Sequence, residues 1–370
     1  MHKILFYSEG WGRGGIERFI MNTVENLDLS KFAFDIYCTH DWDNGYDEEI
    51  HCLGGQRYVS FSNHKPGLVH RLQVSTKAWK NLLEKNKYDI VHINTMNGVG
   101  FVYAHIAAEI GVPCIVVHSH NSDFGGSHRV VKNIAHETGK KLYGGDATVR
   151  LACSQQAGNY LFDNRPFEII RNGANTKIFV YSRSARNAIR EDLDIPESAI
   201  VFGSIARLAE AKNPVFQIRI LESVRSMGQN AFLLLVGSGP LHDEILSEAK
   251  ERDLLDFVKM PGNTDRPQDF YSAMDIMTMP SVFEGFPMAI AEALSCGLPC
   301  LLSPVVPSID AAHMIQCHLD LSDPVPWARK IVELGRNDDL SMRESYRFEV
   351  EGAGYSSAFA TRRIESLYLQ

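Results

Sequence analysis

The sequence predicts an α/β protein with two Rossmann-like, doubly wound domains that face a central cleft. Three observations lead to this fold class. Short β-rich apolar runs alternate with longer stretches of helical spacing, which is typical of a parallel sheet covered by helices on both faces. The alternation starts a second time after a polar stretch in the middle of the chain. The 370 residues are enough for two domains of ordinary size, each with its own core.

The first half of the chain contains a series of predicted strands with helical segments between them. After the first strand, apolar residues recur at helical spacing from Ile16 through Ile20 and Val24 to Leu27. The predicted strands of this half are Ile4–Tyr7, Phe34–Cys38, Ile90–Ile93, Cys114–Val117, Val149–Cys153 and Glu168–Ile170.

The second half repeats this organisation. Its predicted strands are Ile200–Ile205, Phe232–Val236, Phe257–Met260, Ile276–Met279 and Pro299–Leu302. Ligands of such sheets bind at the carboxyl ends of the strands, so the polar residues that follow each strand are the candidates for a site.

The stretch from Asn172 to Pro196 is polar and holds no apparent core strand, so we place the linker between the domains there. The predicted domains are residues 1–172, which would bind the acceptor, and 173–352, which would bind the donor. Residues 353–370 have apolar positions at helical spacing and predict a C-terminal helix. Sequence spacing leaves open whether that helix packs on the second domain or crosses back to the first.

Composition and charge narrow the classes of function. Hydrophobic residues make up 45% and charged residues 22% of the chain, as in ordinary globular domains. The formal net charge of -8 gives no global attraction to nucleic acid, so we expect no nucleic-acid partner. The N-terminal apolar run is too short for a signal peptide, and no segment approaches about 18 uninterrupted apolar residues. We therefore expect a cytoplasmic protein.

The seven cysteines predict reduced thiols. Their number is odd and no CxxC pair occurs, which argues against a disulfide framework or a zinc site. Most of them lie in apolar surroundings typical of core thiols, as at Cys38, Cys114, Cys153 and Cys300.

Two motifs of the first half follow strands. Gly14 and Gly15 form a strand-to-helix turn where backbone can approach an anion closely, or where a tight turn merely needs small residues. A second strand ends in His118-Ser119-His120-Asn121. A histidine there could bind substrate or handle a proton, and one of the pair is expected to be structural.

Two motifs of the second half could hold a phosphate. Arg207 and Lys212 follow the first strand of this half, just before a helix expected to begin at Asn213-Pro214. Two cations beside a helix N-terminus are typical of a diphosphate clamp, although exposed loop cations are often only solvated. Val236-Gly237-Ser238-Gly239-Pro240 again follows a strand, as a phosphate or base contact or as a simple turn.

The strongest motif is a pair of glutamates in the second half. Glu284 lies in the loop after a strand, and Pro287 is expected to start the helix that carries Glu292. The helix start offers N–H groups suited to phosphate, and the two carboxylates suit sugar and ribose hydroxyls. Glu292 is surrounded by apolar residues, so it needs a partner if it is buried.

Together these motifs resemble those of the GT-B glycosyltransferases of family 4, and in particular the bacterial exopolysaccharide and capsule subgroup. The resemblance runs over nearly the whole chain. The matched elements are Gly14 to Arg18, the strand-end histidines, Asn172-Gly173, Arg207 with Lys212, Gly237 to Pro240, and Glu284 through Glu292.

The resemblance implies roles for the matched residues. Arg207 and Lys212 would hold the donor diphosphate and stabilise the leaving nucleotide. Glu284 would contact the transferred sugar, and Glu292 would bind the ribose hydroxyls. His120, or His118 as the second choice, would lie near the sugar and the acceptor.

The resemblance also implies a wider set of contacts. Donor-binding residues would be Gly14, Gly15, Gly237, Gly239, Gly285, Phe286, Pro287, Met288 and Glu292. Residues near the acceptor or the sugar would be His118, Asn121 and Glu17. No metal or other cofactor is expected, because two cations and a helix terminus would do the work of Mg²⁺. We expect retention of the anomeric configuration by front-face transfer, with a nucleotide sugar, most often UDP-linked in this family, as the donor.

Two further readings stay open from the sequence. The chain could be a nucleotide-sugar-binding GT-B protein of another activity, such as an epimerase, or a non-catalytic scaffold. Segments 64–87 and 129–141 are basic and amphipathic, which is typical of a solvated helix face or of one that lies on an anionic membrane. A lipid-linked or glycan acceptor would suit docking at the inner face of the cell membrane.

Overall fold

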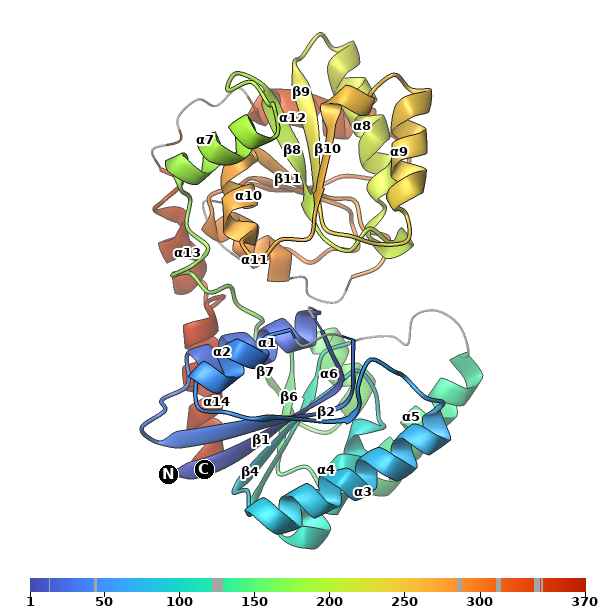
Figure 1. Ribbon diagram of the computed structural model, residues 1–370, viewed down its shortest axis with the longest axis vertical. Helices are drawn as coiled ribbons and strands as arrows, with labels where there is room; N and C mark the ends of the chain where they lie inside the picture. Colours follow the sequence, from blue (N-terminus) through green and yellow to red (C-terminus); the bar gives the residue numbers. More distant parts are fainter. Residues whose placement is uncertain are drawn as a thin grey trace. The chain divides into compact units, whose positions relative to one another are not determined.

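The computed structural model describes residues 1–12, 14–42, 45–121, 129–284, 288–310, 314–335, 340 and 342–370, with the backbone alone for 129–132. These residues form two compact units. The first unit comprises Met1–Asn172 together with Ser357–Gln370, and the second comprises Gly173–Ser356. Each unit contains one sheet flanked by helices, as the alternation of strands and helices predicts (Figure 1).

The sheet of the first unit has seven strands in the order β3-β2-β1-β4-β5-β6-β7, and neighbouring strands are parallel. The sequence correctly predicts every one of them except β3, an edge strand whose residues are all half-buried and form no apolar run. The strands are β1 (His2–Trp11), β2 (Phe32–Asp41), β3 (Arg57–Phe61), β4 (Ile90–Thr95), β5 (Cys114–Ser119), β6 (Val149–Ala152) and β7 (Glu168–Ile169).

The helices of the first unit include one from the far end of the chain. The helices are α1 (Gly15–Glu25), α2 (Asp47–Cys52), α3 (Leu68–Asn86), α4 (Gly100–Ile110), α5 (Arg129–Tyr143), α6 (Gln155–Phe162) and α14 (Ser357–Tyr368). Helix α4 packs between α3 and α5, and α1 packs against α14.

Helix α14 is anchored to the first unit at both of its ends. Ser357 lies 3.1 Å from the side-chain nitrogen of Asn26, and the Tyr368 hydroxyl lies 2.6 Å from Nδ1 of His92. Ile364 is fully buried between these points. The C-terminal helix therefore crosses back to the first unit, the arrangement that sequence spacing left undecided.

The sheet of the second unit has six strands in the order β10-β9-β8-β11-β12-β13, again parallel. Its edge strand β13 was not predicted from the sequence, because its three residues are polar or half-exposed. The strands are β8 (Ile200–Ile205), β9 (Ala231–Val236), β10 (Val258–Gly262), β11 (Ile276–Met279), β12 (Cys300–Leu302) and β13 (Gln316–His318).

The helices of the second unit correct the predicted linker. Residues 173–196 belong to this unit and contain helix α7, capped by the Ser182 hydroxyl, so the stretch is not a free connection. The polar sequence misled because α7 buries arginines instead of aliphatic residues. The α-helices are α7 (Arg183–Asp192), α8 (Pro214–Ser226), α9 (His242–Glu251), α10 (Pro267–Ala273), α11 (Met288–Ser295), α12 (Val325–Leu334) and α13 (Tyr346–Gly352), with 3-10 turns at Glu210–Lys212 and Leu255–Phe257.

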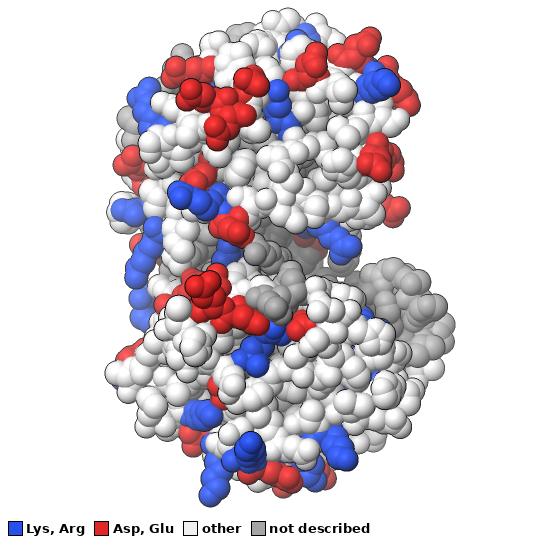
Figure 2. Space-filling model, viewed as in Figure 1, with Lys and Arg blue, Asp and Glu red and all other residues white. Residues whose placement is uncertain are grey.

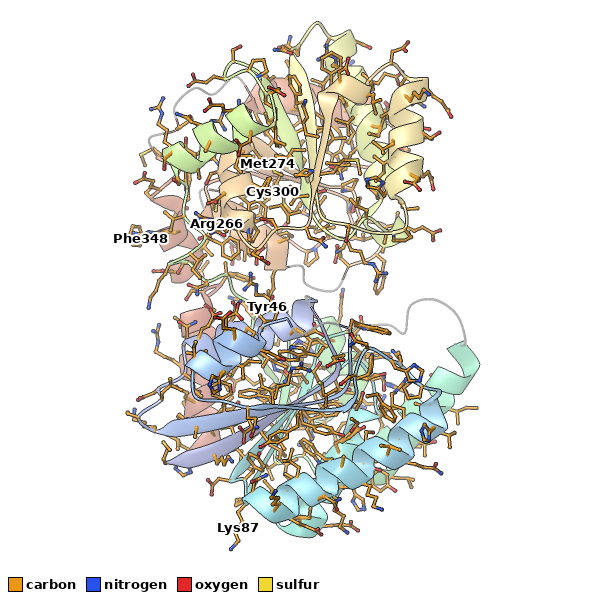
Figure 3. All side chains as sticks on the ribbon, viewed as in Figure 1. Tyr46, Lys87, Arg266, Met274, Cys300 and Phe348 are labelled. Carbon is orange, nitrogen blue, oxygen red and sulfur yellow. The ribbon has the colours of Figure 1, made fainter. Side chains whose placement is uncertain are left out.

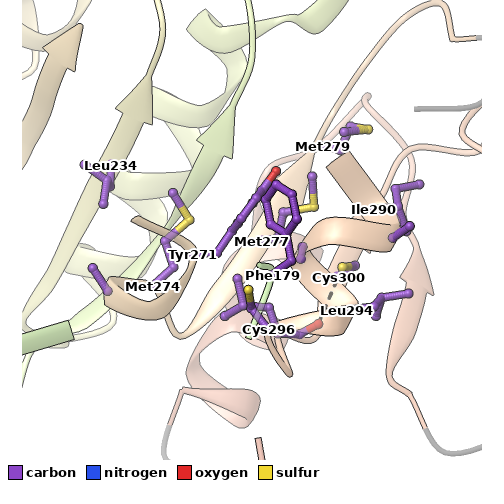
Figure 4. Packing of buried hydrophobic residues seen from close by; sticks show 14 of the residues in the cluster. Phe179, Leu234, Tyr271, Met274, Met277, Met279, Ile290, Leu294, Cys296 and Cys300 are labelled. Atoms are coloured by element: carbon purple, nitrogen blue, oxygen red, sulfur yellow. Dashed lines mark hydrogen bonds between the residues drawn. The ribbon is translucent and has the colours of Figure 1, made fainter. Parts of the chain in front are cut away.

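Two cores cover the two faces of the second sheet. Leu234 and Val236 of β9 face a core that also holds Tyr271 and Ile290 (Figure 4). Their neighbours on the same strand, such as Leu235, face a second core. Strand residues point alternately to opposite faces, so this burial on both sides explains the continuous apolar run of β9.

All seven cysteines are free thiols, as predicted, and Cys38, Cys153, Cys296 and Cys300 are buried. Burial raises the pKa of the Cys38 thiol to about 12 and that of Cys153 to about 11. Such thiols stay protonated and unreactive near neutral pH.

Candidate active site

The loops that carry the predicted donor residues lie at one edge of the second sheet. They follow β8, β9 and β11, which are neighbours in that sheet. Because the carboxyl ends of parallel strands lie on the same side, these loops come together where ligands of such sheets bind.

The glycine loop after β9 packs against the backbone on either side of Arg207. A Cβ atom added to Gly237 would lie 2.1 Å from the carbonyl oxygen of Ala206, and one on Gly239 would lie 2.2 Å from that of Leu208. Gly237 also has a φ of +132°, which favours glycine. Both glycines therefore let their loop approach the backbone on either side of Arg207, in addition to any contact with the donor.

The Arg207 side chain is exposed, and its guanidinium has no hydrogen bond or ion pair with any residue that the structure describes. A guanidinium has five donors in a rigid fork that matches phosphate oxygens. Arg207 can therefore turn toward an anion without first breaking a contact within the protein.

Lys212 forms an ion pair with Glu284. The carboxylate also accepts from the Ser281 hydroxyl at 3.0 Å, and its side chain is only 8% exposed. The backbone joins the same two segments, since the Val282 nitrogen donates to the Ala211 carbonyl at 2.9 Å. A cation of the kind that binds phosphate and a carboxylate of the kind that binds hydroxyls thus lie side by side.

Glu292 is buried on α11 and has the partner that its burial calls for. Its side chain lies 3.4 Å from the hydroxyl of Tyr271 on α10, and only 9% of the residue is exposed. Burial and the neighbouring carboxylate raise the pKa of Tyr271 well above its ordinary value. The tyrosine therefore remains a hydrogen-bond donor to Glu292 at all physiological pH values.

Of the predicted donor-binding residues between Glu284 and Glu292 in the sequence, only some belong to the described residues. Gly285, Phe286 and Pro287 lie outside the described residues. Helix α11 begins at Met288, which is buried. Helix α8 departs from prediction in one detail: Asn213 precedes it as expected, yet Asn213 has left-handed backbone and makes no side-chain cap.

In the first unit, His118 is a structural residue. It is fully buried on β5, and its Nδ1 lies 3.2 Å from Nε2 of His92 on β4. His92 in turn meets the Tyr368 hydroxyl of α14. Burial lowers the pKa of His92 to about 3 and that of His118 well below its ordinary value, so both rings are neutral. No part of His118 is exposed in this structure.

His120 lies one residue beyond the end of β5 and is only partly buried. Its ring centroid lies 4.2 Å from that of His118 and 4.9 Å from that of Phe19, near the start of α1. Its Nε2 lies 2.9 Å from Oδ1 of Asn94 on β4. Burial lowers the pKa of His120 to about 3. Asn121, its neighbour, is also partly buried.

Helix α1 follows the glycine turn after β1, and its Phe19 packs against His118 and His120. Gly14 precedes α1, and a Cβ atom added to it would lie 2.5 Å from a carboxylate oxygen of Glu17. For Gly15, no heavy atom of the described residues beyond its chain neighbours and its own helix backbone lies within 4 Å of such a position. The Glu17 carboxylate therefore lies beside Gly14 at the N-terminus of α1, where an anion would bind. Of the two glycines, Gly15 is the one with open space around its Cβ position among the described residues.

Several residues of these clusters were missed from the sequence, namely His92, Asn94, Tyr271 and Ser281. A signal existed for two of them. His92 and Asn94 are polar residues two apart among the apolar Ile90, Val91 and Ile93 of β4. Their spacing and register place both on the same face as the His118 and His120 pair. No comparable pattern marks Tyr271 or Ser281.

The basic segments offer fewer free cations than the sequence suggested. Arg71 binds Glu9 at 2.9 Å, and Lys140 is buried against Asp163 at 2.8 Å. The interleaved Trp79 and Leu83 face the core. Exposed lysines remain along α3, and Lys87, which follows the helix, is exposed as well (Figure 3). Acidic side chains lie among the basic ones on the face shown in Figure 2.

Within the described residues, no helix is long and apolar enough to cross a membrane. No group of three or more His, Cys, Asp or Glu side chains comes together there in an arrangement that could hold a metal ion.

Both halves of the chain match family models. Residues 13–178 match the model described as Glycosyltransferase Family 4, and residues 185–314 match that described as Glycosyl transferases group 1. The first match lies mostly in the first structural unit and the second lies within the second unit. Together they include the histidines His118 and His120 and the candidate donor residues from Arg207 to Glu292.

Relatives and solved structures share this organisation. The chain is 30% identical to the glycosyltransferase EpsF of Bacillus subtilis over 89% of this chain and 86% of that protein. It is 26% identical to UDP-Gal:alpha-D-GlcNAc-diphosphoundecaprenol alpha-1,3-galactosyltransferase of Escherichia coli, over 78% and 76% respectively. Among solved structures, Anabaena HepE in complex with UDP-glucose aligns with a TM-score of 0.80 at 17% identity over 99% of each chain.

Proposed function

We propose, because the chain belongs to glycosyltransferase family 4 and has the GT-B fold, that it transfers a hexose or an N-acetylhexosamine from a UDP-sugar and retains the anomeric configuration. The observation that carries the proposal is the Lys212–Glu284 pair at the carboxyl end of the second sheet. The pair supports the proposal because an ammonium group, which suits phosphate, is in contact with a carboxylate, which suits a sugar hydroxyl.

The donor would be held by four side chains of the second unit. Arg207 and Lys212 would bind the diphosphate, Glu284 the transferred sugar and Glu292 the ribose hydroxyls. As the bond to the sugar breaks, negative charge grows on the leaving phosphate, and fixed cations beside it lower the barrier. We propose that these cations make a metal ion unnecessary, so that EDTA leaves the rate unchanged.

Retention would follow from transfer on one face of the sugar. The acceptor hydroxyl would attack the face that the phosphate leaves, so no protein nucleophile is needed. The departing phosphate would take the proton of that hydroxyl, so no protein base is needed. The low pKa of His120 supports this arrangement, because a ring that holds a proton so weakly is a poor general base.

The acceptor would be a glycan or a lipid-linked sugar in exopolysaccharide, capsule or other cell-envelope synthesis. The printed name of the Escherichia coli relative, with a UDP-sugar donor and a lipid diphosphate acceptor, supports this class of reaction. The enzyme would then work in the cytoplasm at the inner face of the membrane, with Lys77 and Lys80 of α3 among its exposed cations. Vesicle flotation with phosphatidylglycerol tests the contact, and equal flotation of wild type and Lys77→Glu/Lys80→Glu contradicts it.

A nucleotide-sugar panel tests the proposed activity directly. UDP-glucose, UDP-galactose, their N-acetylamino forms and GDP-mannose are screened by thermal shift, and the donor that stabilises most is then assayed for nucleotide release with and without EDTA. The anomeric configuration of the product is read by NMR. We expect a UDP-sugar to stabilise the protein and to give an α-linked product.

Lys212→Met tests the site, and a second lysine variant is its control. Lys212→Met should lower turnover by about 10²- to 10³-fold, as loss of one charge-stabilising donor does elsewhere. Lys250→Met, at an exposed lysine on α9, should turn over like wild type. Full activity of Lys212→Met, or binding of donor with no turnover by the wild type, would contradict the proposal.

A further inference from the structure

Asn94 is a fully buried amide near the carboxyl end of β4 in the first unit. Its side-chain nitrogen donates to the backbone carbonyls of Tyr7 at 3.3 Å and His92 at 3.4 Å. Both of these partners can only accept, so the amide nitrogen faces them and Oδ1 faces the other way. The group that Oδ1 faces is Nε2 of His120, at 2.9 Å.

This contact decides which nitrogen of His120 carries the proton. An amide oxygen only accepts, so Nε2 must donate and the neutral ring holds its lone pair on Nδ1. The lowered pKa of His120 keeps the ring neutral across the physiological range. No side chain or backbone group of the described residues bonds Nδ1, which is thus available to a ligand.

His118 cannot take the same role. Its Nδ1 is already bonded to His92, and its Nε2 is buried without a partner among the described residues. Of the two strand-end histidines, only His120 combines a fixed proton with partial exposure.

We propose that Asn94 is a positioning residue that holds His120 as its Nε2–H tautomer and so presents Nδ1 as a hydrogen-bond acceptor to a substrate hydroxyl. The inference rests on the proposed function, since it takes a sugar hydroxyl as the ligand. The hydroxyl can belong to the transferred sugar or to the glycan acceptor, and both sources share the same chemistry.

NMR tests the tautomer without any need for activity. Long-range 1H–15N spectra of protein labelled with 15N-histidine are recorded at pH 7.5, and the His120 signals are identified by their loss in His120→Gln. We expect the Nε2–H pattern in the wild type and a mixture of tautomers in Asn94→Leu. An Nδ1–H pattern in the wild type overturns the inference, even if the chain proves to be an active transferase.

Asn94→Asp is the conservative variant. It retains an acceptor for Nε2 and should keep the wild-type tautomer, but its charge raises the pKa of His120. Among the described residues, the titratable groups that face this ring are His92 and His118, and both stay neutral because burial lowers their pKa. Turnover of Asn94→Asp should therefore fall from pH 7.5 to 5.5, as Nδ1 becomes protonated, and that of the wild type should change much less.

A double-mutant cycle separates positioning from a general loss of structure. Asn94→Leu should lower kcat/KM about tenfold, the cost of one misplaced hydrogen bond, and should add no loss in a His120→Gln background. An equal loss in donor hydrolysis without acceptor assigns the hydroxyl to the transferred sugar; a loss in transfer alone assigns it to the acceptor. Asn86→Leu on α3 is the control and should act as wild type. Additive losses in the cycle overturn the inference.

Discussion

At the scale of single residues, the candidate site consists of side chains that neighbours hold in place. The carboxylate of Glu284 is bound by Lys212 and Ser281, and that of Glu292 by Tyr271. Arg207 differs because its guanidinium is free among the described residues. An exposed guanidinium can steer an anion inward, and carboxylates that are already oriented would lose little side-chain entropy on binding the hydroxyls proposed for them.

The Glu292–Tyr271 contact makes opposite predictions for two variants. Glu292→Gln keeps the shape of the side chain and removes a buried charge, so turnover should fall at least tenfold with little change in stability. Tyr271→Phe should instead cost about 1 kcal/mol of unfolding free energy, because it leaves a buried carboxylate oxygen without that donor. Urea unfolding and nucleotide release measure both effects. Unchanged turnover in Glu292→Gln would argue against its role in donor binding.

The buried histidines predict a loss of stability in mild acid. His92 stays neutral in the folded state down to a pH of about 3, whereas in the unfolded chain it gains a proton below about pH 6.5. The unfolded state therefore binds more protons between these values, and stability falls as pH falls through that window. The slope is at most about 1.4 kcal/mol per pH unit for each such histidine.

Urea unfolding from pH 7 to 5.5 checks this expectation. His92→Gln should be less stable at pH 7, because it loses the contact with Tyr368, but its stability should depend less on pH. His242→Gln, an exposed histidine on α9, should show the wild-type slope. An identical slope in all three proteins would contradict the assignment.

At the scale of elements, three arginines fix the end of α10 in the second unit. Arg186 and Arg190 of α7 both bind Asp275 and also donate to backbone carbonyls around Ala273. Arg343 donates to the carbonyls of Tyr271 and Met274. Positive charge at a helix C-terminus is favourable, and the carbonyls there have no partners within the helix. The polar α7 is thus held by ion pairs and hydrogen bonds where an aliphatic face would be usual.

Asp275→Ala tests how much this cluster contributes to the element. It leaves two buried guanidiniums without their carboxylate, which should cost about 3–5 kcal/mol of unfolding free energy. Asp192→Ala, at an exposed position at the end of α7, should cost less than about 0.5 kcal/mol. Calorimetry and urea unfolding compare the two. A similar small cost for both would mean that the arginines are satisfied by the carbonyls alone.

At the scale of the whole molecule, the two units have separate cores and the chain passes between them twice, near 172–173 and 356–357. Separate cores allow each unit to unfold as its own cooperative event. Because Arg207, Lys212, Glu284 and Glu292 all belong to the second unit, the nucleotide should stabilise that unit in particular.

Calorimetry with and without UDP tests this division. We expect two transitions. UDP at about 100 times its Kd should add about 2.7 kcal/mol to the unfolding free energy of the unit that binds it, and should raise the Tm of that unit alone. Ile364→Ala, on the buried face of α14, should lower the Tm of the other transition. Leu369→Ala, at an exposed position, should leave the Tm of both transitions unchanged. A single transition that UDP and Ile364→Ala both shift would show that the units unfold together.

The sequence by itself determined the fold class, the central strands and the identity of the candidate donor residues. Central strands are buried on both faces and so must be apolar, and residues such as Arg207 and Glu284 are found because they follow those strands. Half-exposed edge strands such as β3 have no such pattern. Helix α7 was missed because buried arginines look like surface residues in a sequence.

Only the tertiary structure decided which side chains meet. That Lys212 pairs with Glu284, that Tyr368 reaches His92 across 276 residues of sequence, and that Asn94 orients His120 all depend on contacts between distant segments. The periodicity and spacing of apolar residues in a sequence describe one helix or strand at a time. Register between strands and the return of α14 are set by the packing of the whole unit, which no local pattern contains.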